Sequence, residues 1–283
     1  MPVLVREICE SYKVRLCEVL INLKAEKIIM SLNRRKLIKF MAGGAAASIL
    51  TTPVLSLAAT KPKIKAIAFD GFPIFDPRPI FELSKTLFPE QGNALAKLWF
   101  SKIFGYTWQR TVAAHYKSFY PIIEDALIFS AESLKLNLLP KEQKQLMNIW
   151  LNLKVWPDVK PALQKFKENN IRLGFLSNLT EEMLRINARN SGVEDAFEFY
   201  LSTDRVQAYK PSPLAYQMGV EAFGLPKENI AFAAFGGWDA AGAKWFGYPT
   251  VWVNRFGVPT ERLDIKPDSI GKSIDQLVNF VLP

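Results

Sequence analysis

An aspartate at the end of an apolar run is the first residue of this sequence that could do chemistry. Asp70 follows the run 64–69, IKAIAF, and the chain turns at once through Gly71. Such a run predicts a buried strand, so Asp70 would lie at the C-terminal edge of a sheet, where open α/β folds bind ligands. A carboxylate there can act as a nucleophile. Asp70 could equally cap a helix or begin a turn, and both interpretations stay open at this point.

Further polar side chains follow the later strands of the chain. Each has a structural explanation of its own, because Ser177 or Asp239 could cap a helix and Lys210 could be a solvated surface lysine. Since the carboxyl ends of parallel strands meet at one edge of a sheet, we expect these groups to converge on Asp70. They are Ser177 and Asn178 after a strand at 171–177, Lys210 after a strand at 198–202, and Asp239 after a strand at 229–235.

Alternating strands and helices must position these side chains. The β-rich runs lie at 64–70, 171–177, 198–202, 229–235 and 249–253, with predicted helices at about 159–169, 180–191, 212–223 and 239–246. From about 79 to 153 the apolar residues recur instead at helical spacing. The pattern predicts an α/β fold, a doubly wound parallel sheet that a helical insertion opens after its first strand.

Composition narrows the functional classes. The 283 residues are 49% hydrophobic, which is enough for a sizeable core. Of the net charge of +9, residues 1–41 carry +5 (9 Lys/Arg, 4 Asp/Glu), which leaves +4 for the rest (27 Lys/Arg, 23 Asp/Glu). The remainder is therefore only mildly basic, and the sequence has no basic stripe with interleaved aromatic residues. Both features argue against a nucleic-acid partner.

Cysteine and histidine are scarce. Cys9 and Cys17 both lie near the N-terminus, so the remainder offers neither a disulfide framework nor a cysteine-based metal site. His115, the single histidine, falls in a predicted helix at 111–120 without a nucleophile-elbow motif nearby. A Ser-His-Asp triad and a histidine-rich metal site are therefore disfavoured.

The N-terminal part reads as an export signal. A basic cluster at 34–36 precedes a modestly apolar stretch at 41–59 that ends in small residues, as signal peptides do. The pair Arg34-Arg35 resembles the twin-arginine signal, which predicts an exported, periplasmic or extracellular protein and the twin-arginine export machinery as a partner. A retained membrane anchor is the alternative. Residues 1–29 fit no part of the signal, so Met30 is a candidate start.

Four motifs resemble those of the haloacid dehalogenase superfamily, specifically its type II (S)-2-haloacid dehalogenase branch. They are AFDGFPIFD, FLSN, YKPSPLAY and GGWDAAGAKWFGYPTVWVNR, and LWFSKIFGYTWQR resembles the cap of that branch. The resemblance spans residues 65–282 and implies a Rossmann-like core with an inserted helical cap. The implied organisation is an N-terminal extension with signal peptide at 1–60, a core at 61–78 and 157–283, and a cap at 79–156.

The resemblance also implies a role for each residue at the sheet edge. Asp70 would be the nucleophile that displaces halide and forms an ester, which water then hydrolyses. Lys210 would keep Asp70 ionised, and Asp239 would orient the lysine and help to activate the water. Ser177 and Asn178 would hold the substrate carboxylate or the nucleophile. The implied substrate-binding set is Ser177, Asn178, Phe72, Phe100, Tyr216 and Trp238.

The chain departs from the family pattern at several donors. Phe100 stands where the family has a halide-binding arginine, and Pro73-Ile74 replace a stretch with a threonine. Ala234 and Gly236 replace a serine and an asparagine. Losing one preorganised donor costs about 2.7–4 kcal/mol of barrier, so two independent losses would cost roughly 10⁴-fold in rate. Arg78, Arg110 and a backbone nest at Gly236-Gly237 are the candidate replacements.

The sequence thus predicts a hydrolase that cleaves carbon–halogen bonds of small 2-haloacids, or acts on another small carboxylic acid, without a metal or cofactor. One alternative is a catalytically reduced relative that binds a small acid. The other is a phosphatase, which Phe72 disfavours because superfamily phosphatases place an acidic group there and bind Mg²⁺ nearby. The family further implies a homodimer.

Overall fold

The computed structural model describes residues 63–282. The predicted signal peptide and the start at Met30 lie outside the described residues. Within the described range, no helix is sufficiently long and apolar to cross a membrane.

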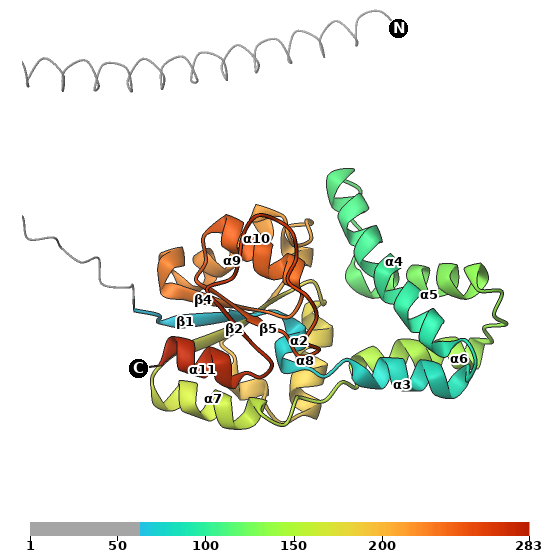
Figure 1. Ribbon diagram of the computed structural model, residues 1–283, viewed down its shortest axis with the longest axis horizontal. Coiled ribbons are helices and arrows are strands. Elements are labelled where there is room, and N and C mark those ends of the chain that lie inside the picture. Colours follow the sequence, from blue (N-terminus) through green and yellow to red (C-terminus); the bar gives the residue numbers. More distant parts are fainter. Residues whose placement is uncertain (1–62, 283) are drawn as a thin grey trace, which may run out of the picture. The chain divides into compact units, whose positions relative to one another are not determined.

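A parallel sheet lies at the centre of the described chain (Figure 1). Its six strands follow the order β3-β2-β1-β4-β5-β6, and every neighbouring pair is parallel. The α/β prediction is therefore confirmed, although β6 was not predicted. The strands are β1 (Ala66–Phe69), β2 (Arg172–Ser177), β3 (Phe199–Ser202), β4 (Ile230–Ala234), β5 (Thr250–Val253) and β6 (Ser269–Gly271).

Helices cover both faces of the sheet because its strands are apolar on both sides. In β1, Ile67 and Phe69 join one core cluster, while Ala66 and Ala68 join the other. One pair of helices packs on each face (Figure 1). These are α7 (Val159–Glu168) with α11 (Asp275–Val281), and α9 (Pro213–Phe223) with α10 (Gly237–Phe246); α8 (Glu181–Asn190) packs beside β3.

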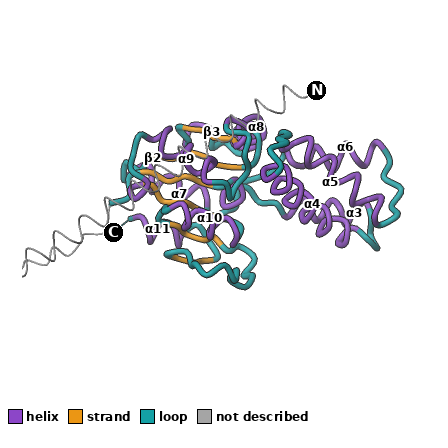
Figure 2. The backbone as a smooth tube through the Cα atoms, turned by 90° about the horizontal axis from the view of Figure 1, so that it is seen from above, coloured by secondary structure: helices purple, strands orange, loops and turns teal. Residues whose placement is uncertain are grey.

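A group of helices, the cap, lies beside the sheet domain (Figure 2), and in the chain it is inserted between β1 and α7. Its linkers pair with each other: the amide of Asp76 donates to Lys154 (2.8 Å), and the amide of Trp156 donates to Ile74 (3.0 Å). The cap helices are α3 (Arg78–Leu87), α4 (Gly92–Val112), α5 (Phe119–Ser133) and α6 (Pro140–Asn148), followed by a 3-10 turn at Ile149–Leu151.

Two local predictions were wrong. The predicted helix at 111–120 does not form, because α4 ends at Val112 and Ala114 adopts a positive φ of 53°. His115 therefore lies on an exposed loop. The predicted turn after Asp70 is instead a short helix, α2 (Gly71–Ile74).

Candidate active site

Asp70 is both a helix cap and a cavity residue, so the two interpretations of it are compatible. Its amide donates to the carbonyl of Ala233 (3.0 Å), which extends the β1–β4 ladder by one bond. Its Oδ2 accepts from the amide of Phe72 (3.3 Å) and so caps α2. The side chain keeps 12% of its surface exposed. The end of β1 and the N-cap of α2 together fix where the carboxylate lies.

Gly71 leaves room for this arrangement. A Cβ at this position would lie 2.7 Å from Cδ1 of Leu179 and 3.2 Å from Oγ of Ser177. The start of α2 can therefore approach the end of β2 closely, which brings Ser177 to Asp70.

Lys210 lies between two carboxylates and has no solvent exposure. Its Nζ donates to Oδ1 of Asp70 (2.8 Å) and to Oδ2 of Asp239 (2.6 Å). Burial lowers the pKa of Lys210, but the negative charges of Asp239 and Asp70 outweigh that effect, so its pKa is raised above the ordinary value. The two carboxylates therefore favour the charged form of Lys210.

Asp239 contacts Lys210 on the side that faces away from the cavity. Its Oδ1 accepts from the hydroxyl of Tyr216 (2.7 Å), whose carbonyl accepts from the hydroxyl of Tyr248 (2.6 Å). Burial raises the pKa of Asp239 to about 6, although Lys210 pulls it in the opposite direction. Asp239 orients the ammonium group, but it is not among the residues that line the cavity.

Ser177 and Asn178 end β2 on the other side of Asp70. The hydroxyl of Ser177 donates to Oδ1 of Asp70 (3.4 Å) and accepts from the amide of Leu179 (3.2 Å). Oδ1 of Asn178 accepts from the amide of Lys210 (3.1 Å), while its Nδ2 is buried without a hydrogen-bond partner. Asn178 lines the cavity, so its amide nitrogen is a donor held ready for a ligand.

A cavity of about 120 Å³ opens in front of Asp70, between the sheet edge and the cap. Its walls are mostly aromatic. The lining residues are Asp70, Phe72, Phe100, Phe104, Phe119, Ser177, Asn178, Leu179, Phe235, Gly236 and Trp238. An apolar wall beside a carboxylate limits its hydration and suits an uncharged reacting carbon.

The predicted set assembles in this region with one correction. Asp70, Lys210 and Asp239 form the ion-paired row, and five of the six predicted substrate-binding residues line the cavity: Ser177, Asn178, Phe72, Phe100 and Trp238. The prediction that Tyr216 lines the site was wrong, because its ring is fully buried and its hydroxyl serves Asp239.

The two arginines considered as replacement donors lie elsewhere. Arg78 binds Asp76 through both carboxylate oxygens (2.6–2.9 Å), and Arg110 donates to the carbonyl of His115 (3.2 Å). Neither lines the cavity, whose described lining contains no lysine or arginine. Of the predicted replacements, Gly236 alone contributes to the wall.

Sequence reasoning did not place Phe119, Leu179 or Phe235 at the site. Phe235 directly follows strand β4, and Leu179 lies two residues after the end of β2; this position after a strand is the signal that could have found them. Phe119 begins α5 in the cap, so no neighbouring strand in the sequence indicates that it reaches the site.

An arginine whose side chain is 5% exposed connects the cap linkers to α2, the short helix that carries Phe72. Arg255 donates from Nη2 to the carbonyl of Pro73 (2.7 Å) and from Nη1 to Oδ2 of Asp158 (2.5 Å). Nε1 of Trp156 donates to the carbonyl of Phe72 (3.0 Å), and the guanidinium of Arg255 stacks on that indole at 4.7 Å. These contacts hold the first turn after Asp70 in place.

The donor set around Asp70 does not fit a divalent metal ion. The ammonium of Lys210 already lies between the two carboxylates that would have to bind the ion. Across residues 63–282, no group of three or more His, Cys, Asp or Glu side chains is arranged to hold one.

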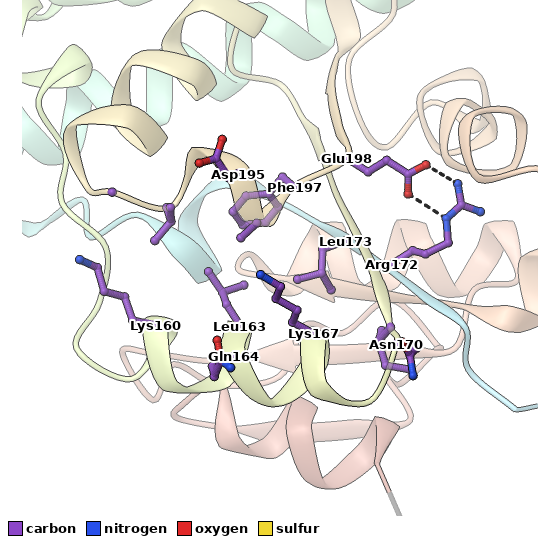
Figure 3. A pocket seen from close by; sticks show the side chains of 14 residues that line it. Lys160, Leu163, Gln164, Lys167, Asn170, Arg172, Leu173, Asp195, Phe197 and Glu198 are labelled. Atoms are coloured by element: carbon purple, nitrogen blue, oxygen red, sulfur yellow. Dashed lines mark hydrogen bonds and ion pairs between the residues drawn. The ribbon is translucent and has the colours of Figure 1, made fainter.

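A larger open groove of about 690 Å³ lies at the opposite, N-terminal edge of β2 (Figure 3). Lys160 and Lys167 project from α7 along it, and Arg172 is paired with Glu198 on its far side. The described residues that line this groove include no ion-paired row of carboxylates and lysine like that at Asp70, so its size alone does not make it the active site.

Comparison with known proteins agrees with this geometry. A family model described as haloacid dehalogenase-like hydrolase matches residues 86–247. The haloacetate dehalogenase H-2 of Moraxella sp. (strain B) is 36% identical over 220 residues, which are 77% of this chain and 98% of that protein. The (S)-2-haloacid dehalogenase of Pseudomonas sp. (strain YL) is 34% identical over 206 residues, 72% of this chain and 89% of that protein.

Solved structures give the same result. The crystal structure of an L-2-haloacid dehalogenase superposes with a TM-score of 0.76 at 36% identity, covering 78% of this chain and all of that one. A dehalogenase crystallised as an intermediate complex has a TM-score of 0.75 at 26% identity, covering 78% of this chain and 99% of its own.

Proposed function

Because the chain belongs to the haloacid dehalogenase-like hydrolase family, we propose that it hydrolyses the carbon–halogen bond of small 2-haloacids with Asp70 as nucleophile. The observation that carries the proposal is the position of Lys210, whose ammonium joins Asp70 to Asp239 at the floor of the aromatic cavity. A lysine held there places a positive charge directly beside the carboxylate that acts as the nucleophile.

In the first step, an oxygen of Asp70 attacks the halogen-bearing carbon, and the halide leaves with the bonding electron pair. Oδ1 already accepts from Lys210 (2.8 Å) and Ser177 (3.4 Å), whereas Oδ2 accepts only the long bond from the amide of Phe72 (3.3 Å). Oδ2 therefore has the more available lone pairs and is the attacking atom. The product is an ester between Asp70 and the acid.

In the second step, water adds to the ester carbonyl of Asp70. The acyl–oxygen bond breaks, the 2-hydroxy acid leaves with one proton of the water, the carboxylate of Asp70 is restored, and the other proton is released to solvent. The ammonium of Lys210, 2.8 Å from Oδ1, stabilises the negative charge that develops on that carbonyl oxygen. Asp239 holds the ammonium in this orientation from behind.

Neutral hydrogen-bond donors, in place of a lysine or arginine in the cavity wall, bind the leaving halide and the substrate carboxylate. The unpartnered Nδ2 of Asn178 is one of them. The first amides of α10 are another, since this helix begins at Gly237 without a side-chain cap and the preceding Gly236 lines the cavity.

Halide release tests the proposal. Purified protein is incubated with chloro-, bromo- and fluoroacetate and with the two enantiomers of 2-chloropropanoate. We expect halide release that disappears in Asp70→Asn and persists in Asp76→Asn, a nearby carboxylate paired with Arg78. No release by the unaltered protein from any of these acids would overturn the proposal.

One observation favours a second candidate function. Since the described lining residues of the cavity include no lysine or arginine, a small acid could be bound without turnover. Saturable binding of the same acids without halide release would establish this alternative. A phosphatase is disfavoured, because Phe72 offers no acidic group and Lys210 occupies the place between the carboxylates.

Export remains part of the proposal on sequence grounds alone. Residues 30–60 have the order of a twin-arginine signal peptide, with cleavage expected after the small residues that end at Ala59. N-terminal sequencing of the native product tests it, with replacement of Arg34-Arg35 by two lysines expected to block export. A native terminus upstream of Met30 would contradict it. The proposed homodimer is tested by the mass of the protein in solution.

A further inference from the structure

A second apolar groove lies outside the Asp70 cavity, between the cap and the core. It has a volume of about 540 Å³, and its lining within residues 63–282 includes no charged side chain. Its lining residues are Trp108, Thr111, Val112, Tyr209, Pro211, Ser212, Trp238, Trp245 and Leu263. Several are unusually exposed for their size, including Trp245 at 57% and Val112 at 90%. An apolar surface of this kind is typical of a binding site.

The groove and the Asp70 cavity share one wall, the indole of Trp238. Two rings of the cap helix α4 lie against it. Phe104 belongs to the cavity and Trp108 to the groove, and each ring centroid is 5.4 Å from that of Trp238. The two spaces therefore adjoin at this indole.

One face of α4 runs through both spaces. Phe100, Phe104, Trp108 and Val112 recur every four residues, so they form a single stripe along the helix. The first two line the cavity and the last two line the groove. Twelve residues of α-helix extend about 18 Å, so the stripe is several times longer than a small acid.

We propose that the outer groove binds the apolar tail of the substrate, so that the preferred substrates are 2-haloacids with an extended alkyl or aryl chain. This inference rests on the proposed function, since it places the reacting carbon at Asp70 and the tail beyond Trp238. The uncharged lining selects an uncharged tail, because a charged group would lose its hydration there without gaining a partner.

The continuity of the α4 stripe favours a substrate tail over a protein partner. A tail that extends from Asp70 into the groove has to pass Trp238, the residue that both spaces share, whereas a partner surface would need no residue of the Asp70 cavity. The inner cavity of about 120 Å³ holds the reacting end, and the outer groove adds space along the same helix face.

A chain-length series tests the inference. Bromide release is measured for 2-bromopropanoate, 2-bromobutanoate, 2-bromohexanoate and 2-bromooctanoate. Each methylene buried in the groove is expected to raise kcat/KM about fourfold. Leu263→Asp and Val112→Asn are expected to lower the ratio of kcat/KM between the longest and the shortest acid. Leu139→Asp, at an exposed leucine of the cap outside the groove, is expected to leave that ratio unchanged.

A binding measurement separates this inference from the proposed function. Tryptophan fluorescence reports the groove through Trp108 and Trp245 while acetate, butanoate, hexanoate and octanoate are titrated. A Kd that falls with chain length supports the tail groove even if no acid is turned over. Turnover with no chain-length dependence in rate or Kd overturns the groove and leaves the dehalogenase proposal standing. A dimer that Leu263→Asp dissociates, together with length-independent binding, assigns the groove to a second copy and also overturns the inference.

Discussion

Lys210 and Asp239 form an ion pair that is closed to solvent: Nζ lies 2.6 Å from Oδ2, and the two side chains are 0% and 1% exposed. Because removing either charge leaves the other buried without compensation, both the stability of the fold and the state of Asp70 depend on this pair.

Lys210→Met is expected to abolish activity and to lower the free energy of unfolding by about 3–5 kcal/mol at pH 8. Two buried carboxylates, Asp70 and Asp239, then lose their shared cation. The loss should be smaller at pH 5, because the pKa of Asp239 is raised to about 6 and this carboxylate then takes up a proton. Urea unfolding at both pH values measures it, with Lys160→Met on the surface of α7 as the control. Equal losses for the two lysines would contradict the expectation.

Activity should fall as the pH drops through about 6. The pKa of Asp239 is raised to about 6, mainly by burial, so acidification neutralises the partner that orients Lys210. The sign for stability is the opposite. The folded state binds this proton more tightly than the unfolded chain, so the contribution of Asp239 to the free energy of unfolding declines as pH rises from about 4 to 6. A kcat/KM profile from pH 4.5 to 8 that is flat across pH 6 would refute the assignment.

In Tyr216→Phe, the fall of kcat/KM at acidic pH should begin at a higher pH than in the unaltered protein. The hydroxyl hydrogen bond (2.7 Å) lowers the pKa of Asp239, so its loss raises that pKa further. Tyr248→Phe is the matched control, since that hydroxyl donates to the carbonyl of Tyr216 and not to Asp239. Identical pH profiles for the two variants would mean that Tyr216 has no special effect on Asp239.

Arg255→Met should destabilise the protein by about 1–3 kcal/mol and lower kcat, because the carbonyl of Pro73 loses its donor and Asp158 keeps only the amide of Ile274 as a partner. Arg78→Met is the control, because the guanidinium of Arg78 also stacks on Trp156. Its ion pair with Asp76 is exposed on the arginine side, so this pair contributes at most about 1 kcal/mol. Thermal unfolding and initial rates measure both. Similar effects in the two variants would remove the special role of Arg255.

The sheet edge was predictable because apolar runs end at polar residues there. Asp70 follows β1, Ser177 ends β2, and Asp239 lies in the first turn of α10 after β4. Because β1, β2 and β4 are parallel neighbours, these positions meet at one edge of the sheet, as the sequence pattern predicted. Lys210 is farther from its strand, and its place was predictable mainly from the motif resemblance.

Other features depend on tertiary contacts that a single sequence does not encode locally. Tyr216 was expected in the cavity, but the packing of α9 against α10 turns it toward Asp239. Arg78 and Arg110 were candidate donors on charge alone, and local partners hold both away from the site. Strand β6 is only three residues long and gave no periodic signal.

A single-turnover reaction in ¹⁸O-labelled water tests most directly whether Asp70 is the nucleophile. With protein in excess over a 2-bromoacid, mass spectrometry follows the label in the product and in the peptide that contains Asp70. We predict that the first product carries unlabelled oxygen at C2, taken from Asp70, and that the carboxylate of Asp70 gains ¹⁸O. Label in the first product and none in Asp70 would mean that water attacks the carbon directly, and would contradict this account.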